Sequence, residues 1–513
     1  MGTIAQQSIK GALANYLGVA LGAVITFCVI TDCLTQSEIG LTRVLVDAAL
    51  LFSSLAGLGS NSCIVRFYPY FRTEEQESHG TAKGRDHGFF GLSLLIPGAG
   101  LLLFALLFLL MKEPIAQVYA ENAPMFRDYM YWVLPLTFFA LFTTVFETHA
   151  SVLMRITVPK MVREVGIRLF NLIAYLLYGH GLISIELFVG LFCSSYALAM
   201  VLNLIYLISL KKISLRIDWD YFRKSALGKE IGIYTLFMTA TTLAGNIPLI
   251  NSLFLGAKGG LALAGIYTIA SYIANVVEVP YRSLGAIAGP CIAQATKEHN
   301  LTEVNRLARQ VSLHQFLVAS LLFFFIWINL EPLFGLIPNG ESYRAGIGVV
   351  FYLGIAKIIN SSLSIGTSIL NYSPHYMLAL PLIGVLTLTA ILCNNYLIPL
   401  LGINGSALAT LGAYIIYFLL LMWVLHRKMG VGMLCRGHLT ILVLLLAGFG
   451  LNALWDHFIH IPLGNRTVTL LLNAGLKTTV FALLALWALL KLNISPTISS
   501  YIRRYIGKIK PVS

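Results

Sequence analysis

Apolar stretches of about 20 residues recur along the whole chain, and they constrain its fold more than any other feature. A helix of that length crosses the hydrocarbon core of a bilayer, where every backbone amide must be satisfied within its own helix. The 513 residues are 58% hydrophobic and 11% charged, whereas soluble domains carry about 25% charged residues. Such a composition cannot cover a soluble surface, so the sequence predicts an all-α polytopic membrane protein.

The apolar runs and the turn and charge signals between them predict fourteen membrane-spanning helices. These cover residues 10–30, 42–65, 88–111, 129–153, 164–183, 186–210, 229–250, 261–290, 309–330, 345–368, 376–400, 402–426, 437–456 and 469–490. A polar segment divides the first twelve helices into two groups of six. The predicted organisation is an N-lobe over 1–210, a cytoplasmic linker over 211–228, a C-lobe over 229–426, and two further helices with a basic tail over 427–513.

The positions of Lys and Arg predict the orientation of these helices. With the N-terminus in the cytoplasm, twenty-five of the 35 basic residues fall in cytoplasmic segments and five in outer loops, as the positive-inside rule requires. Both termini are therefore predicted to be cytoplasmic. The net charge of +13 is spread over short loops and not gathered into one patch, so no nucleic-acid partner is expected.

Common catalytic and cofactor motifs are absent from the sequence. It contains no GxxxxGK[ST] phosphate loop, no HExxH and no GxSxG. Its seven cysteines are scattered, without a CxxC pair or a neighbouring histidine cluster, so neither a metal site nor a disulfide framework is expected. The longest outer loops, 112–128 and 331–344, are too short to form a domain. We therefore expect no cofactor and no enzymatic activity.

Charged side chains inside the predicted helices are candidates for function, because each costs roughly 2.5 to 3.5 kcal/mol at a helix centre on insertion scales. Three sets are opposite charges spaced i,i+4 on one helix face: Arg43/Asp47, Glu164/Arg168 and Glu278/Arg282. Such a pair either neutralises itself near the interface or lines a polar cavity. The first interpretation is favoured for the two pairs near helix ends. For Glu278 and Arg282, which sit deeper and flank Pro280, both interpretations stay open.

Lys357 has no charged neighbour three or four residues away on its predicted helix. It shares one helical face with four polar residues, Asn360, Ser361, Ser364 and Ser368. A stripe of that length should not face lipid, so it either bonds to a neighbouring helix or lines a water-filled cavity. The lysine favours the cavity. Lys477, beyond the first twelve helices, carries less weight.

Four stretches between about residues 10 and 430 follow one another in a characteristic order. They read LTQSEIGLTRVLVDAALLFSSLAGLGSNSCIVRFYPYF, MRITVPKMVREVGIRLFNL, GIYTIASYIANVVEVPYRSLGAIAGP and NYLIPLLGINGSALAT. In order and spacing the sequence resembles the polysaccharide transporter (oligosaccharide flippase) family of the multidrug/oligosaccharidyl-lipid/polysaccharide exporter superfamily.

This resemblance implies two six-helix lobes around a central cavity that opens alternately to the two membrane faces, with an extra C-terminal pair that can hold a lipid tail. It implies flipping of a polyprenyl-pyrophosphate-linked oligosaccharide across the bacterial inner membrane, for O-antigen (lipopolysaccharide), capsule or exopolysaccharide assembly with other assembly proteins. Arg or Lys in the cavity would pair with the pyrophosphate. The candidate binding residues, chosen from the helix analysis because the family has no invariant motif, are Arg282, Lys357, Glu278, Asn360, Arg43 and Arg168.

Three other classes of protein are alternatives. A cation-coupled multidrug exporter of the same superfamily should place unpaired acidic residues in the cavity, whereas the acids here mostly have basic neighbours. A major-facilitator transporter should show a Gly-Asp-Arg-Gly-Arg type loop after the second helix, and RFYPYFRTEEQES does not match it. A membrane glycosyltransferase or glycan polymerase should have a large outer loop or an acidic catalytic cluster, and neither is seen.

Overall fold

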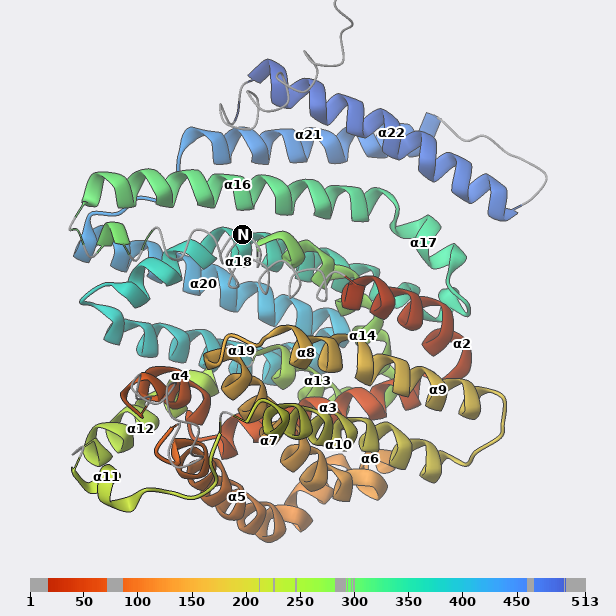
Figure 1. The fold of residues 1–513 in the computed structure, drawn as a ribbon. Coiled ribbons are helices and arrows are strands. Elements are labelled where there is room, and N and C mark those ends of the chain that lie inside the picture. The colour runs from red at the N-terminus through yellow and green to blue at the C-terminus, as the bar shows by residue number, and fades with distance from the viewer. Residues whose placement is uncertain are drawn as a thin grey trace, which may run out of the picture. The chain divides into compact units, whose positions relative to one another are not determined.

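The structure is a computed structural model that describes most of the chain. The described residues are 17–71, 86–211, 213–224, 227–244, 247–281, 300–458 and 466–492, with positions 292, 294–296, 298 and 494. All regular elements within these residues are helices (Figure 1). Eleven helices of this described part are long and apolar enough to cross a membrane. The predicted all-α polytopic membrane fold is confirmed.

The predicted spans coincide with helical backbone in the described part of the chain. The eleven long spans are Gln36–Ala56 (α3), Phe89–Ala120 (α5), Pro124–Val152 (α6 to α7), Ile185–Ser209 (α10), Leu261–Tyr281 (from α14), Leu301–Ile328 (α16), Gly340–Tyr372 (ending in α18), Tyr376–Leu401 (ending in α19), Ile403–Met429 (α20), Arg436–Phe458 (α21) and Val468–Leu492 (in α22). The other three predicted spans fall on shorter helices. These are Leu17–Cys33; α8 (Thr157–Met161) and α9 (Ile167–Gly179), which the π-turn Val162–Gly166 joins; and α12 (Gly228–Ala244) followed by α13 (Ile247–Gly259).

The second predicted span, 42–65, is broken in the structure. The helix α3 ends at Ala56, and α4 (Ser60–Phe71) begins a new helix. Leu58 and Gly59 between them have φ of 45° and 68°, in the left-handed region that ends a helix. Gly59 also packs closely on α12, because a Cβ there would lie 2.7 Å from Cβ of Met238.

The start of α3 is fixed by a capping box and by a close backbone contact. The Thr35 hydroxyl accepts a hydrogen bond from the Glu38 N–H at 3.3 Å, and the Glu38 carboxylate accepts one from the Thr35 N–H at 2.8 Å. Gly40 then lies against the first residue of α14 (Leu261–Asn275). A Cβ on Gly40 would stand 1.9 Å from the carbonyl oxygen of Leu261, so only glycine fits there.

The described part of the predicted linker packs against the start of α5. Gly88 has φ of 71°, and a Cβ on it would lie 2.1 Å from the carbonyl oxygen of Arg216. The backbone N–H of Asp218 donates to the carbonyl of His87 at 3.2 Å. The ring of Tyr221, in α11 (Trp219–Lys224), stacks on that of His87 with centroids 3.8 Å apart. This segment is therefore docked by specific backbone and ring contacts.

The protein forms two compact units, and each unit is built from two separate stretches of the sequence. Unit 1 holds residues 1–268 and 391–406, and unit 2 holds residues 269–390 and 407–513. Within unit 1, α3 packs against α5, α7 and α13. Within unit 2, α16 packs against α18 and α21 (Figure 1). The six-helix lobes with boundaries at residues 210 and 229 stay a prediction.

Candidate functional site

Lys357 of unit 2 is buried within α18 (Ile347–Tyr372) and holds an ion pair. Lys357 is 7% exposed and Glu278 is 4% exposed. The Nζ of Lys357 lies 3.1 Å from Oε1 of Glu278. The Nδ2 of Asn360 donates to the same Oε1 at 2.9 Å. Two charges removed from water remain stable only when the pair is close and further hydrogen bonds support it. Asn360 supplies such a bond here.

This cluster brings together three of the residues selected from the sequence. Lys357 and Asn360 occupy successive turns of α18, whereas Glu278 comes from the short 3₁₀ turn Val276–Glu278 after α14. The predicted partner of Glu278 was Arg282, which lies outside the described residues, because the described segment ends at Tyr281. The pairing of Glu278 with Lys357 had no signal in the sequence, since 79 positions separate the two residues.

The serines of α18 differ in their partners: Ser368 donates to the carbonyl of Ser364 in its own helix, and the Ser361 hydroxyl is buried without a hydrogen-bond partner among the described residues, whereas two others contact the neighbouring helix α16. Ser364 donates to Oε1 of Gln315 at 3.0 Å, and the hydroxyls of Ser312 and Ser362 lie 2.7 Å apart. Among the described residues, Nε2 of Gln315 is buried without a hydrogen-bond partner. The stripe thus contains one hydrogen bond between helices, from Ser364, and a buried charge pair beside it, while the water-filled cavity stays a prediction.

Arg43 and Asp47 of unit 1 form the predicted i,i+4 ion pair. The Nε of Arg43 lies 2.6 Å from Oδ2 of Asp47, which also accepts a hydrogen bond from the Ser252 hydroxyl at 2.5 Å. Because α3 begins at Gln36, the pair lies in the middle of this helix and not near its start. Asp47 is 1% exposed, whereas the Arg43 side chain keeps 23% exposure. The pair is therefore an anchored carboxylate with a partly accessible cation.

Arg168 of unit 1 pairs with Glu164, as predicted, and packs against the first described helix. Its Nη2 lies 3.3 Å from Oε2 of Glu164. A Cβ on Gly22 would stand 2.8 Å from the Arg168 Nη1, so the guanidinium lies directly on the backbone of the helix Leu17–Cys33. That Nη1 is buried and has no hydrogen-bond partner among the described residues.

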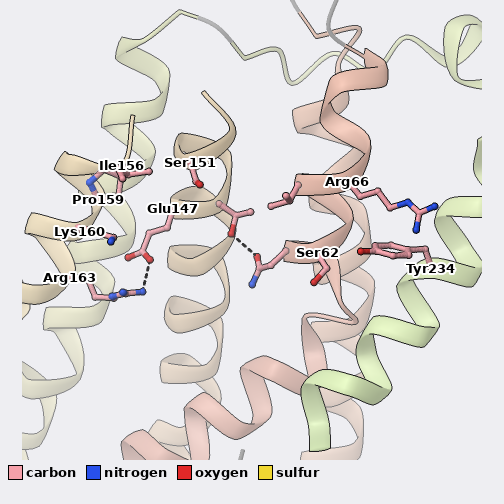
Figure 2. A pocket seen from close by; sticks show the side chains of 12 residues that line it. Ser62, Arg66, Glu147, Ser151, Ile156, Pro159, Lys160, Arg163 and Tyr234 are labelled. Carbon is pink, nitrogen blue, oxygen red and sulfur yellow. Dashed lines mark hydrogen bonds and ion pairs between the residues drawn. The ribbon is translucent and has the colours of Figure 1, made fainter. Parts of the chain in front are cut away.

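A pocket of about 540 Å³ opens in unit 1 between α4, α7, α8 and α12. Figure 2 shows Glu147, Lys160 and Arg163 on one side and Arg66 with Tyr234 on the other. Its lining residues are Asn61, Ser62, Val65, Arg66, Glu147, Thr148, Ser151, Ile156, Pro159, Lys160, Arg163 and Tyr234. Sequence reasoning did not find this site, because it counted the three basic residues only as topology signals at helix ends.

The charged groups of this pocket differ in their contacts. The Nη1 of Arg163 lies 2.8 Å from Oε2 of Glu147. Arg66 lies over the ring of Tyr234, 4.4 Å from its centroid, and pairs with Glu230 at 2.8 Å. The ammonium of Lys160 has no hydrogen bond or ion pair among the described residues. Arg163 and Arg66 are thus each paired with a carboxylate, and Lys160 is the lining cation that has no ion pair among the described residues.

Every buried carboxylate among the described residues has a partner. Asp47 and Glu278 pair with basic side chains. Glu38 accepts from the Thr35 N–H and from the Tyr178 hydroxyl, the latter at 2.5 Å. Asp86, outside the spans, accepts from the backbone N–H groups of Gly88 and Phe90, while burial raises its pKa above the ordinary value. These four acids, the buried ones in the described part of the chain, are therefore each held by a partner.

No protein-family model matches the sequence, and no curated protein matches it as a relative. Solved structures do share its fold. A structure of lipid II flippase MurJ in an inward closed conformation has a TM-score of 0.68 at 12% identity and covers 93% of this chain and 98% of its own. An outward-facing multidrug resistance MATE family transporter of the MOP superfamily has a TM-score of 0.54 at 12% identity. That match covers 88% of this chain and 98% of the transporter chain.

A third structure, a MATE transporter from Vibrio cholerae, has a TM-score of 0.52 at 14% identity and covers 83% of this chain and 98% of its own. Identities this low show the fold alone. The chain is accordingly a multi-pass membrane protein with the fold shared by transporters of the MOP superfamily.

Proposed function

We propose that the protein flips a polyprenyl-pyrophosphate-linked oligosaccharide across the bacterial inner membrane by alternating access. Its fold is that of membrane transporters, and the flippase structure matches 93% of the chain, against 83% to 88% for the two MATE structures described above. The proposed setting is O-antigen, capsule or exopolysaccharide assembly, with both termini in the cytoplasm. The sequence offers no site for ATP hydrolysis, so an ion gradient, the membrane potential or removal of the product would drive transport.

One observation carries this proposal: the buried ammonium of Lys357. An ammonium has three N–H donors, and the contacts of Lys357 with described residues use one of them, toward Glu278. The other donors suit phosphate oxygens, which form charge-assisted hydrogen bonds with Lys. A pyrophosphate leaving water needs such a partner, because an unpaired charge in an apolar medium is very costly. Exchange of the Glu278 carboxylate for pyrophosphate would then couple binding to rearrangement of α18.

Arg43 and Arg168 are the cations proposed to assist in unit 1. Each is held by a carboxylate on its own helix and keeps a partly exposed guanidinium, at 23% and 33% of the side chain. Arg presents a planar set of donors that matches phosphate in a bidentate manner. Arg282 stays a proposed substrate contact on the sequence argument alone.

The test is flipping of a labelled polyprenyl-pyrophosphate-linked oligosaccharide in proteoliposomes. We expect wild type to move the label between leaflets and Lys357→Gln to lose at least tenfold in rate. Since that variant removes the Lys357 charge from the buried Glu278, the matched variant is Lys357→Gln with Glu278→Gln, which removes both charges of this ion pair together. We expect the double variant to fold and still fail in flipping. Flipping at the wild-type rate by the double variant would remove Lys357 from the mechanism.

A cation-coupled exporter is the second candidate function, because the MATE structures share this fold with TM-scores up to 0.54. In that case a buried carboxylate should release its basic partner and bind the coupling cation, and Asp47 is the strongest candidate. Asp47→Asn would then abolish ion-driven efflux of a cationic dye from vesicles. Under the flippase proposal no dye efflux occurs in wild type.

In the native host, deletion of the gene separates these candidates from an upstream enzyme. A flippase deletion should lose surface glycan and accumulate the lipid-linked precursor on the inner leaflet. Loss of the precursor itself would indicate a glycosyltransferase, and full-length surface glycan with a normal precursor would indicate an exporter of another compound.

A further inference from the structure

The pocket of unit 1 has the composition of a site for a small anionic group. Its volume of about 540 Å³ falls in the range of ligand sites, about 300 to 1,000 Å³. Lys160, Arg163 and Arg66 line it against one carboxylate, Glu147. Lys160 and Arg163 are three residues apart, so their side chains leave the same face of the α8 segment, and Figure 2 shows both beside Glu147.

Glu147 shows that an anion already fits against this cationic wall. Its Oε2 accepts from the Arg163 Nη1 at 2.8 Å, while its Oε1 is buried and has no hydrogen-bond partner in the described part of the chain. A buried carboxylate oxygen without a donor is costly. The Nε of Arg163 also contacts Glu164 at 3.3 Å, and Glu164 is shared with Arg168, so departure of Glu147 would leave the Nη1 of Arg163 free to bind another anion. The Glu147 carboxylate thus occupies the Arg163 guanidinium that an incoming anion would bind.

The position of the pocket indicates where that anion comes from. The lining residues Arg66, Lys160 and Arg163 lie in segments predicted to be cytoplasmic, 66–87 and 154–163, and Tyr234 lies near the start of the predicted span 229–250. The pocket therefore lies at the predicted cytoplasmic interface, between membrane helices. Apolar side chains share the lining, and Val65 among them is 55% exposed. Basic pockets between helices on the cytoplasmic side are typical sites for anionic lipid headgroups.

We infer that this pocket binds the phosphate group of an anionic membrane lipid, with Lys160 and Arg163 as the phosphate ligands. Asn61 and Thr148, which bond to each other at 3.2 Å, and the hydroxyl of Ser151 supply neutral polar groups on the same lining. Binding displaces the Glu147 carboxylate from Arg163. The same phosphate chemistry occurs in a glycerophospholipid and in a polyprenyl diphosphate. The site does not depend on the transport function proposed above.

Native mass spectrometry of the full chain, released from detergent with defined lipids, tests this inference. The probes are phosphatidylglycerol, farnesyl diphosphate, inorganic pyrophosphate and, as zwitterionic control, phosphatidylcholine. We expect wild type to retain phosphatidylglycerol or farnesyl diphosphate well above phosphatidylcholine. Whichever of the two binds more tightly identifies the lipid source. Pyrophosphate binding as tight as either lipid overturns the assignment to a membrane lipid.

The variants separate this pocket from general attraction between charges. We expect Lys160→Gln and Arg163→Gln each to weaken lipid binding about tenfold, and Glu147→Gln to strengthen it. Lys428→Gln removes an exposed Lys near the end of α20 that is not one of the pocket lining residues, and is the matched control without effect. Lipid binding equal to wild type in both Lys160→Gln and Arg163→Gln overturns the inference. Because Glu147→Gln should raise affinity, misfolding cannot mimic the full pattern.

Discussion

The hydroxyl of Ser252, in α13, donates a hydrogen bond to Asp47 of α3, with 2.5 Å between Oγ and Oδ2. Ser252 is 1% exposed, as is Asp47, so neither group can turn to water instead. Together with Arg43 on the preceding turn, Ser252 satisfies a carboxylate in the middle of a membrane span. This bond ties two helices of unit 1 that are 205 residues apart at the contact.

Ser252→Ala should therefore weaken unit 1. The variant leaves Asp47 with one donor fewer in a buried position, and we expect a loss of about 1 kcal/mol in the free energy of unfolding. Thermal unfolding in detergent, followed by fluorescence, measures it. Ser194→Ala is a suitable control, because within the described part of the chain its hydroxyl bonds only to a carbonyl of its own helix, that of Leu191. Equal stability of the Ser252 variant and wild type would contradict the role given to this bond.

Gly40→Ala should prevent correct packing at the start of α3. The added Cβ would lie 1.9 Å from the Leu261 carbonyl oxygen, which is backbone and cannot rotate away. We expect a severe loss of folded protein, seen as aggregation in size-exclusion chromatography. Gly98→Ala in α5 is the control, since its Cβ would meet nothing within 4 Å. The expectation fails if both variants give monodisperse protein in equal yield.

Gly88→Ala should release the docked segment at residues 213–224. Two effects combine there, a left-handed φ of 71° and a Cβ position 2.1 Å from the Arg216 carbonyl oxygen. We expect faster trypsin cleavage at Arg216 and Arg223 than in wild type. Gly181→Ala shares the positive φ, at 70°, but its Cβ would meet nothing within 4 Å. That control should therefore leave cleavage unchanged.

The predicted orientation can be tested by cysteine labelling in intact cells. In a background where the seven cysteines are replaced, Glu121→Cys sits in a predicted outer loop and Asp220→Cys in the predicted cytoplasmic linker. We expect a membrane-impermeant maleimide to label position 121 in intact cells and position 220 only after lysis. The reverse pattern would place both termini outside, and the pocket of unit 1 with them.

The sequence was sufficient for the spans, because hydrophobic length is a local property that the bilayer selects directly. It did not predict where a span is broken, as between α3 and α4. The apolar composition continues across Leu58, and the left-handed turn there is supported by the packing of Gly59 against α12, a contact that no local window contains.

The sequence predicted contacts between charged residues that lie one turn apart in the same helical segment. It did not predict contacts between residues of different helices. The pairs Arg43/Asp47 and Glu164/Arg168 follow from i,i+4 spacing and are present. The carboxylate that holds Lys357 comes from another helix, so only three-dimensional packing selects it. The pocket beside Glu147 gathers residues from α4, α7, α8 and α12, each ordinary in its own segment.

Lys357 and Asn360 approach one and the same oxygen atom of Glu278, at 3.1 and 2.9 Å. Their positions on neighbouring turns of α18 mean that a rotation of this helix about its axis moves both donors away from that atom together. Such a rotation would therefore break or restore the two contacts together. Under the transport proposal, it would free the Glu278-bound donors of Lys357 and Asn360 for a bound anion in one step.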